Sequence, residues 1–237
     1  MSLRKTKIDW TDYAWNPITG CTLKCKYCYA QRFAERYGWS TEPRFHPLRL
    51  KEARNKGQPG RVFISTMGEP FDPWWQRDAL VDEIWRQILE IVRQTPQRVY
   101  YVLSKRPAVA ADVLSWLVAP ENLRLGFSGE TPKIAVHRIR EWLWRARRAV
   151  PLFVSLEPLF PFRYGPAIAR QFREVGVRWV IIGKLTQMDY PKGEYFPVAE
   201  ARKLVEGCQE VGIPVWIKDN AQGDLGSLAV QQRPEGW

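Results

Sequence analysis

The stretch Arg98–Val118, RVYYVLSKRPAVAADVLSWLV, contains one complete strand-and-helix unit. Its first seven residues are rich in β-branched and aromatic side chains, which is typical of a strand buried on both faces of a parallel sheet. Lys105 and Arg106 end this apolar run, and a helical pattern follows from Ala108 to Val118. A strand followed at once by a helix favours a parallel sheet with right-handed crossovers.

The same unit recurs along the chain. The expected strands are Asp12–Asn16, Arg61–Thr66, Arg98–Ser104, Leu123–Ser128, Pro151–Leu156, Arg178–Ile182 and Pro214–Lys218. The expected helices are Ala30–Tyr37, Trp74–Arg93, Ala108–Val118, Ile134–Arg148, Ala167–Val175 and Val198–Val211. This alternation predicts an α/β fold, a partial (βα)6-type barrel with mostly parallel strands, as one domain over residues 1–237. A doubly wound open sheet is the alternative.

The composition is that of a soluble globular protein, with 45% hydrophobic and 26% charged residues. No apolar run is long enough to span a membrane, and no apolar segment follows the basic N-terminus. We therefore expect a cytoplasmic protein without a membrane partner. The net charge of +11 favours anionic partners such as nucleic acid, although scattered basic residues also fit a surface kept soluble by charge.

Three of the four cysteines lie within eight residues, in the segment GCTLKCKYCYA. The spacing is C-x3-C-x2-C, and in a cytosolic protein such a cluster more often binds a metal than forms disulfides. The thiolates of Cys21, Cys25 and Cys28 can hold three irons of a cubane cluster and leave the fourth iron open. Catalytic metal centres need an open coordination site, whereas structural sites tend to be closed.

The cysteine spacing, with the aromatic Tyr27 just before the last cysteine, resembles the signature of the radical S-adenosylmethionine (radical SAM) superfamily. In that superfamily the motif follows the first strand, as here, and a Gly-Gly-Glu-Pro segment ends the second. The matching place carries Gly68-Glu69-Pro70, preceded by Met67 instead of the first glycine. The segments WNPITGC, LSKRP and SLEPL are similar to a small phage-associated branch of the superfamily, whose usual Gly-Gly-Glu-Ser stretch is replaced here by IGKLT.

The resemblance implies a [4Fe–4S] cluster on the three cysteines and S-adenosylmethionine (SAM) as the second cofactor. It implies an enzyme that receives one electron from a flavodoxin- or ferredoxin-like donor, cleaves SAM reductively and produces a 5′-deoxyadenosyl radical that abstracts a hydrogen from its substrate. Glu69 is expected to accept a hydrogen bond from the SAM ammonium group. Its alternative role is to stabilise the following helix through the helix dipole.

The resemblance also assigns further side chains to SAM. The residues expected to contact SAM are Gly68, Glu69, Pro70, Tyr27, Ser128, Glu130, Ile182 and Gly183. The glycine of the Gly-Glu-Pro segment would let the backbone approach SAM closely. Ser128 and Glu130 stand where superfamily members often bind the ribose, and Ile182 and Gly183 where they often touch adenine. Tyr27 is expected to flank adenine or to shield the cluster.

Charged residues stand just past several expected strands, and in βα barrels the site forms at these carboxyl ends. Those assigned to the substrate are Lys105, Glu157, Lys184, Lys218 and Asp219. The lysines predict a polar, anionic substrate. Nucleic acid is one candidate for it, and a protein partner is another. The structural alternative is an ion pair of Glu157 with Lys105 or Lys218, because buried charges need partners.

A non-enzymatic nucleic-acid-binding module with a structural metal site is the alternative function. The positive charge and the twelve tryptophans would suit phosphate contacts and base stacking. A zinc site would need Cys208 or His46 as a fourth ligand, and neither has a partner at ligand spacing. Most tryptophans fall within expected helices and strands, where packing is their usual role. The sequence identifies neither the substrate nor a catalytic residue.

Overall fold

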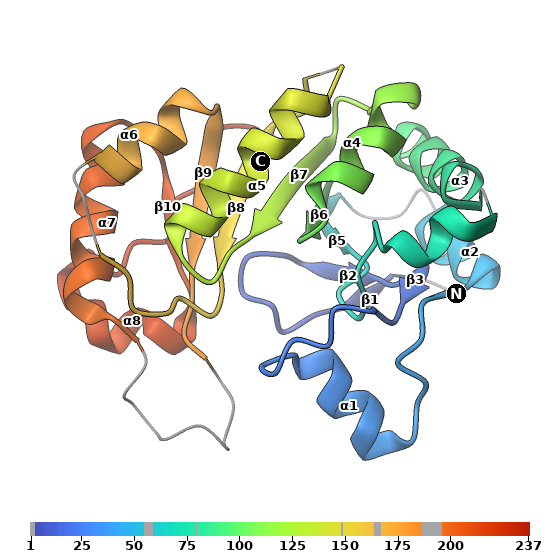
Figure 1. Cartoon of the computed structure of the whole chain (residues 1–237), viewed down its shortest axis with the longest axis horizontal. Coiled ribbons are helices and arrows are strands. Elements are labelled where there is room, and N and C mark those ends of the chain that lie inside the picture. The colour runs from blue at the N-terminus through green and yellow to red at the C-terminus, as the bar shows by residue number, and fades with distance from the viewer. Residues whose placement is uncertain (1–2, 55–58, 79, 148, 164–166, 186–195) are drawn as a thin grey trace. The chain divides into compact units, whose positions relative to one another are not determined.

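The structure is a computed structural model that describes residues 3–54, 59–78, 80–147, 149–163, 167–185 and 196–237. The chain divides into two compact units, Met1–Leu125 with Arg145–Val150, and Gly126–Trp144 with Pro151–Trp237 (Figure 1). Strand β7 (Leu123–Ser128) therefore begins in the first unit and ends in the second. The expectation of one domain over the whole chain stays a prediction.

The first unit is built on a mostly parallel sheet. Its strands lie in the order β1 (Arg4–Lys5), β2 (Tyr13–Trp15), β5 (Gly60–Ile64), β6 (Arg98–Ser104) and the start of β7. Strands β2, β5 and β6 pair in parallel, and β1 is an antiparallel edge. Because parallel strands end at the same edge, the segments that follow β2, β5 and β6 meet there. These segments carry the three cysteines, the Gly-Glu-Pro motif and Lys105.

Helices and short segments surround this sheet. They are α1 (Tyr29–Tyr37), α2 (Leu50–Arg54), α3 (Leu80–Gln94), α4 (Pro107–Trp116), the 3₁₀ segments η1 (Pro47–Arg49) and η2 (Pro73–Asp78), and the antiparallel pair β3 (Ile18–Thr19) and β4 (Arg44–Phe45). The expected helix Trp74–Arg93 is thus two segments, η2 and α3, with residue 79 outside the described ranges. The Asp72 side chain accepts a hydrogen bond from Trp74 N at 3.0 Å, which favours a tight turn over an α-helix at this point.

Aromatic side chains fill the core of the first unit. Trp10 packs on Phe63 at 4.8 Å between ring centroids. Phe71 stacks on Trp85 at 4.4 Å, and Trp85 Nε1 donates to Pro70 O at 3.1 Å. The last contact matters for the site, because it fixes the residues after Glu69 against helix α3.

The second unit repeats the pattern. After the end of β7 come β8 (Leu152–Leu156), β9 (Val177–Ile182) and β10 (Val215–Ile217), which pair in parallel. Its helical segments are α5 (Pro132–Arg145), α6 (Ala167–Glu174), α7 (Val198–Glu210), α8 (Asp219–Leu225) and η3 (Gly226–Leu228). The end of the chain returns along β10, where Ile217 N donates to Val230 O at 2.8 Å and Gln231 forms an antiparallel bridge with Trp216.

The predicted α/β fold with mostly parallel strands is confirmed. Each expected strand is present to within two residues at either end. In each unit the described strands follow the order of the sequence, and among them there is no reversal of strand order of the kind that defines a doubly wound sheet. The expected helix Ile134–Arg148 runs from Pro132 to Arg145, and Arg148 itself lies outside the described residues. Within the described ranges, no helix is long and apolar enough to cross a membrane.

Gly126 provides a test of packing in the second unit. A Cβ atom at this position on β7 would lie 2.3 Å from Cζ of Phe153. We expect Gly126→Ala to lower the free energy of unfolding by about 1–3 kcal/mol, as overpacked cores do. The matched control is Gly223→Ala in α8, where a Cβ would meet nothing within 4 Å. This substitution should stabilise the helix by about 0.5–1 kcal/mol. Urea denaturation followed by circular dichroism measures both, and equal stability of the two variants would contradict this account.

Candidate functional site

The three clustered cysteines lie on the loop between β3 and helix α1, and all three thiols are half-buried. Cys28 is the N-cap residue of α1, and its backbone N donates to Cys25 O at 2.9 Å. Lys24, between the first two cysteines, has a left-handed backbone with φ 48°. Burial raises the pKa of the Cys21 thiol to about 12. The loop is therefore a compact turn with its thiols partly shielded from water.

Gly20 and Gly68 join the cysteine loop to the Gly-Glu-Pro segment. They form a parallel β-bridge in which Gly20 N donates to Met67 O at 2.9 Å and Glu69 N donates to Gly20 O at 3.0 Å. A Cβ on Gly68 would lie 2.7 Å from Gly20 O, so only glycine permits this approach. The close neighbour of Gly68 in the structure is the backbone of Gly20. The predicted approach of the Gly68 backbone to SAM stays a prediction.

Asp72 forms a second connection between the same segments. Its carboxylate is fully buried and accepts hydrogen bonds from Thr22 N at 2.8 Å and from Thr22 Oγ1 at 2.9 Å. Thr22 directly follows the first cysteine. The residue two positions after Pro70 thus fixes the start of the cysteine loop by hydrogen bonds to a charged acceptor, which are stronger than neutral ones.

Glu69 lies in the interior, where only 5% of the residue is exposed. Its Oε1 accepts from Ser104 Oγ at 2.6 Å and from Phe71 N at 3.2 Å, and its Oε2 accepts from Lys105 N at 2.9 Å. Burial raises the pKa of Glu69, while these three donors act in the opposite direction. The carboxylate therefore connects the end of β5 with the end of β6. A carboxylate has about four acceptor positions, so one position is left for a further donor.

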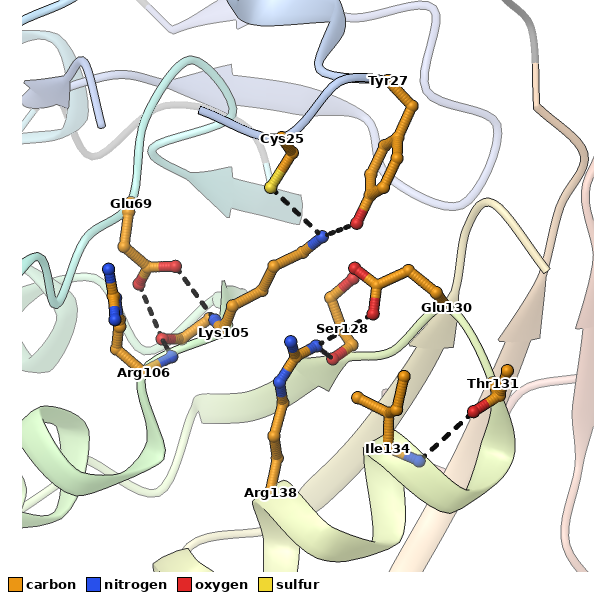
Figure 2. A network of polar contacts seen from close by, with 11 residues as sticks. Cys25, Tyr27, Glu69, Lys105, Arg106, Ser128, Glu130, Thr131, Ile134 and Arg138 are labelled. Carbon is orange, nitrogen blue, oxygen red and sulfur yellow. Dashed lines mark hydrogen bonds and ion pairs between the residues drawn. The ribbon is translucent and has the colours of Figure 1, made fainter. Parts of the chain in front are cut away.

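The Lys105 side chain extends from the end of β6 to the cysteine loop (Figure 2). Its Nζ lies 3.8 Å from Cys25 Sγ, donates to Tyr27 Oη and stands 4.5 Å from the centre of the Tyr27 ring. The ammonium group therefore lies against the side chain of the second cysteine of the motif. The structure thus brings Lys105, which the sequence assigned to the substrate, together with Tyr27 and a predicted cluster ligand.

The donor set fits an iron–sulfur cluster by its chemistry, since three thiols share one loop beside an ammonium group. In the described ranges, however, no three side chains of His, Cys, Asp or Glu are gathered closely enough to hold a metal ion. The thiols of Cys21, Cys25 and Cys28 would have to turn toward one another to bind a cluster. Coupling of this kind between metal binding and local structure is common in metal sites.

The two candidates for a fourth metal ligand are engaged elsewhere. Cys208 is fully buried on α7, where burial raises the pKa of its thiol to about 12. His46 Nε2 is hydrogen-bonded to Thr19 Oγ1 at 2.8 Å. Cys208 therefore packs as a small apolar residue, as the sequence suggested.

In the second unit, Ser128 and Glu130 share one partner, Arg138 of helix α5 (Figure 2). Arg138 Nη1 donates to Ser128 O and lies 3.6 Å from Glu130 Oε2. Glu130 O also accepts from Phe160 N at 2.8 Å. The two residues predicted to bind the SAM ribose thus lie close together at the end of β7. The Arg138 guanidinium of α5 contacts both of them.

The remaining charged residues of the second unit form pairs. Lys218 Nζ donates to Glu157 Oε1, which is one of the two ion pairs that the sequence left open. A Cβ on Gly183 would lie 2.9 Å from Cδ of Lys218, so this glycine, which follows the buried Ile182, makes room for the pair. Lys184 is paired with Asp224.

Asp219 begins helix α8 and accepts from Gln222 and Gln231, both at 3.0 Å. The loop after Lys184 and Leu185, including Thr186, lies outside the described residues.

Sequence reasoning missed four residues that support the cysteine loop and the strand ends. They are Asn16, Thr22, Asp72 and Ser104. Asn16 Oδ1 accepts from Thr66 Oγ1 at 3.0 Å and from Met67 N at 3.1 Å, so it orders the turn before Gly68. Two of these residues could have been found because they are polar and lie beside a turn or a motif. Asn16 precedes a proline after β2, and Asp72 directly follows the Gly-Glu-Pro-Phe run.

Solved structures of spore photoproduct lyase share this fold. A variant of that protein with a cysteine-to-serine substitution matches with a TM-score of 0.61 at 12% identity, over 92% of this chain and 79% of that one. A doubly substituted variant with bound AdoMet and dinucleoside spore photoproduct matches with a TM-score of 0.60 at 14% identity, over 90% and 78%. At such low identity the similarity concerns the fold alone.

Among proteins with curated functions, none matches the chain in sequence. A family model described as "Protein of unknown function (DUF5131)" matches residues 5–232. Because this match spans far more than half of the 237 residues, the chain belongs to the DUF5131 family.

Proposed function

We propose that this protein is a radical SAM enzyme that holds a [4Fe–4S] cluster on Cys21, Cys25 and Cys28. The observation that carries the proposal is the Gly20–Gly68 bridge, because it sets the three-cysteine loop directly against the Gly-Glu-Pro segment. The two motifs resemble the same superfamily independently, and they are far apart in the sequence. The fold of this chain is similar to that of spore photoproduct lyase, of which one structure contains AdoMet, and this similarity supports the proposed SAM binding.

In this proposal, different residues of the first unit contact SAM and the cluster. When bound, the cluster and SAM supply a 5′-deoxyadenosyl radical by one-electron cleavage of the SAM C–S bond. Glu69 offers its remaining acceptor position to the SAM ammonium group, and its three internal hydrogen bonds orient the carboxylate beforehand. The Lys105 ammonium lies beside Cys25, a proposed cluster ligand, and donates to Tyr27 Oη.

The substrate in this proposal is polar and anionic, and nucleic acid is the candidate to test first. The support is the net charge of +11, together with Lys184 and Lys218 at the ends of β9 and β10. Both lysines are paired with carboxylates, Asp224 and Glu157 respectively. An anionic group can therefore bind these lysines only by competing with their present partners, which would favour a strongly charged group such as a phosphate.

The non-enzymatic alternative has less support. Seven tryptophans, Trp10, Trp15, Trp75, Trp85, Trp142, Trp179 and Trp216, are buried and therefore unable to stack on bases. Neither Cys208 nor His46 is free to complete a closed metal site, since one is buried as an apolar residue and the other is bound to Thr19.

The cluster assignment predicts a difference between two cysteine variants. After anaerobic reconstitution, Cys208→Ala should retain about four irons per chain and the visible absorbance of a cubane cluster. Cys28→Ala should lose both, because it removes one of three ligands. Iron analysis and absorbance measure the outcome. Loss of iron in Cys208→Ala, with an unchanged far-ultraviolet circular dichroism spectrum, would make Cys208 a fourth ligand and exclude an open iron.

The SAM assignment predicts that Glu69→Gln weakens SAM binding. A hydrogen bond to a charged group contributes about 1.5–3 kcal/mol, so the dissociation constant should rise at least about tenfold. Calorimetry on the reconstituted protein measures it, and 5′-methylthioadenosine, which lacks the amino acid part, should bind both proteins equally. If Glu69 acts only as a brace between β5 and β6, the variant will instead show a lower unfolding temperature with unchanged SAM affinity.

The substrate proposal predicts salt-dependent binding of short single-stranded and duplex oligonucleotides. Affinity should fall steeply between low and moderate salt, because phosphate contacts release counterions. A Lys184→Ala/Lys218→Ala double variant should bind more weakly and with a smaller salt slope. The control, Lys51→Ala/Lys133→Ala, removes the same charge from exposed positions on α2 and α5. Equal weakening by both double variants would show that only the overall charge acts.

A further inference from the structure

Helix α1, which begins at the last cysteine of the loop, carries an exposed aromatic surface toward its C-terminal end. Of the residues in this helix only Ala34 is buried, and in Figure 1 the helix lies apart from α2, α3 and α4. Phe33, Tyr37 and Trp39 are 44%, 52% and 58% exposed. We call these three residues the α1 aromatic surface. Large aromatic side chains exposed in a group are typical of interaction sites, whereas single ones need no explanation.

The aromatic surface is ordered by contacts among its own side chains. The Phe33 and Tyr37 rings stack at 6.0 Å with 9° between planes, and Tyr37 and Trp39 stack at 5.1 Å with 27°. Gly38 ends the helix in the left-handed conformation, with φ 66°, and Trp39 N donates to Ala34 O at 2.7 Å. This helix end turns Trp39 back toward Tyr37. A preordered aromatic group loses little conformational entropy when it binds a partner.

The surroundings of this surface carry an excess of positive charge. Exposed cations stand before, within and after the helix, at Lys24, Lys26, Arg36 and Arg44, against Glu35 and Glu42. The Arg36 guanidinium lies 5.7 Å from the centre of the Tyr37 ring. Aromatic residues and arginine are the residue types that contribute most to protein–protein binding energy. An exposed aromatic group on a chain segment with excess positive charge fits a partner with an acidic face.

The position of the α1 aromatic surface indicates that it would bind an electron donor rather than a substrate. A substrate must reach the SAM held near Glu69 and Lys105, whereas a donor needs only to approach a cluster ligand. Helix α1 begins directly at such a ligand, because Cys28 is its N-cap.

We infer that the α1 aromatic surface docks the protein that reduces the cluster, a small acidic one-electron carrier of the flavodoxin type. The inference rests on the proposed radical SAM function, and it adds the place where the electron enters. In this step the carrier loses one electron and the cluster gains it. Neither a bond nor a proton is exchanged between the two proteins.

Binding of a purified flavodoxin to the reconstituted full chain tests the inference. We expect Phe33→Ser/Trp39→Ser to raise the dissociation constant about tenfold or more, as loss of interface aromatics does. The control is Trp116→Ser/Trp144→Ser, which removes two tryptophans that are 69% and 81% exposed on α4 and α5. Charge reversal by Arg36→Glu should slow association most at low salt.

SAM cleavage then separates this inference from the proposed function. Dithionite, a small reductant that needs no docking site, should support equal SAM cleavage by wild type and by Phe33→Ser/Trp39→Ser. Cleavage driven by flavodoxin should fall about tenfold in the variant alone. Equal flavodoxin binding by both proteins, or no binding by wild type at low salt, would overturn the docking surface. Failure of wild type to cleave SAM even with dithionite would overturn the proposed function, whatever the binding result.

Discussion

The cysteine loop depends on one close contact between two glycines. Gly20 and Gly68 pair through their backbones, and a Cβ on either residue would collide with another part of the backbone. At Gly20 the collision would be with Glu42 O at 2.0 Å, and its φ of +80° also favours glycine. These two residues therefore decide where the cysteines stand relative to Glu69. The hydrogen bonds between Asp72 and Thr22 join the same two segments a few residues further along.

Two buried carboxylates then convert this contact into a rigid support. Glu69 and Asp72 are both buried, and a buried charge is tolerated only when it is well hydrogen-bonded. Glu69 meets this demand through Ser104 and the Lys105 backbone on β6, and Asp72 meets it through Thr22. The need to satisfy these charges therefore ties together the ends of β5 and β6 and the start of the cysteine loop. Such internal bonds fix geometry before any ligand arrives, which is what a positioned site requires.

The sequence predicted the strands well because continuous apolar runs are a local signal. Arg98–Ser104 and Leu123–Ser128 have the expected bounds. Helices α2 and α8 were missed, since five and seven residues are too few to show a helical period. The positions of the cysteines and of Glu69 followed from motifs, whereas their partners did not. Which carboxylate pairs with Lys218, or what lies against Gly183, depends on residues far away in the sequence.

Lys105 shows why residue type alone does not assign a role. Its backbone N–H binds Glu69 and its ammonium reaches Cys25, so one residue touches both predicted cofactor positions. The two lysines that follow β9 and β10, Lys184 and Lys218, are instead paired with carboxylates. The Lys105 ammonium lies beside the Cys25 thiol and donates to the Tyr27 phenol. Two lysines that follow strands thus join their own carboxylates, whereas a third reaches the loop of the proposed cluster ligands, and only the packing of distant segments decides between these roles.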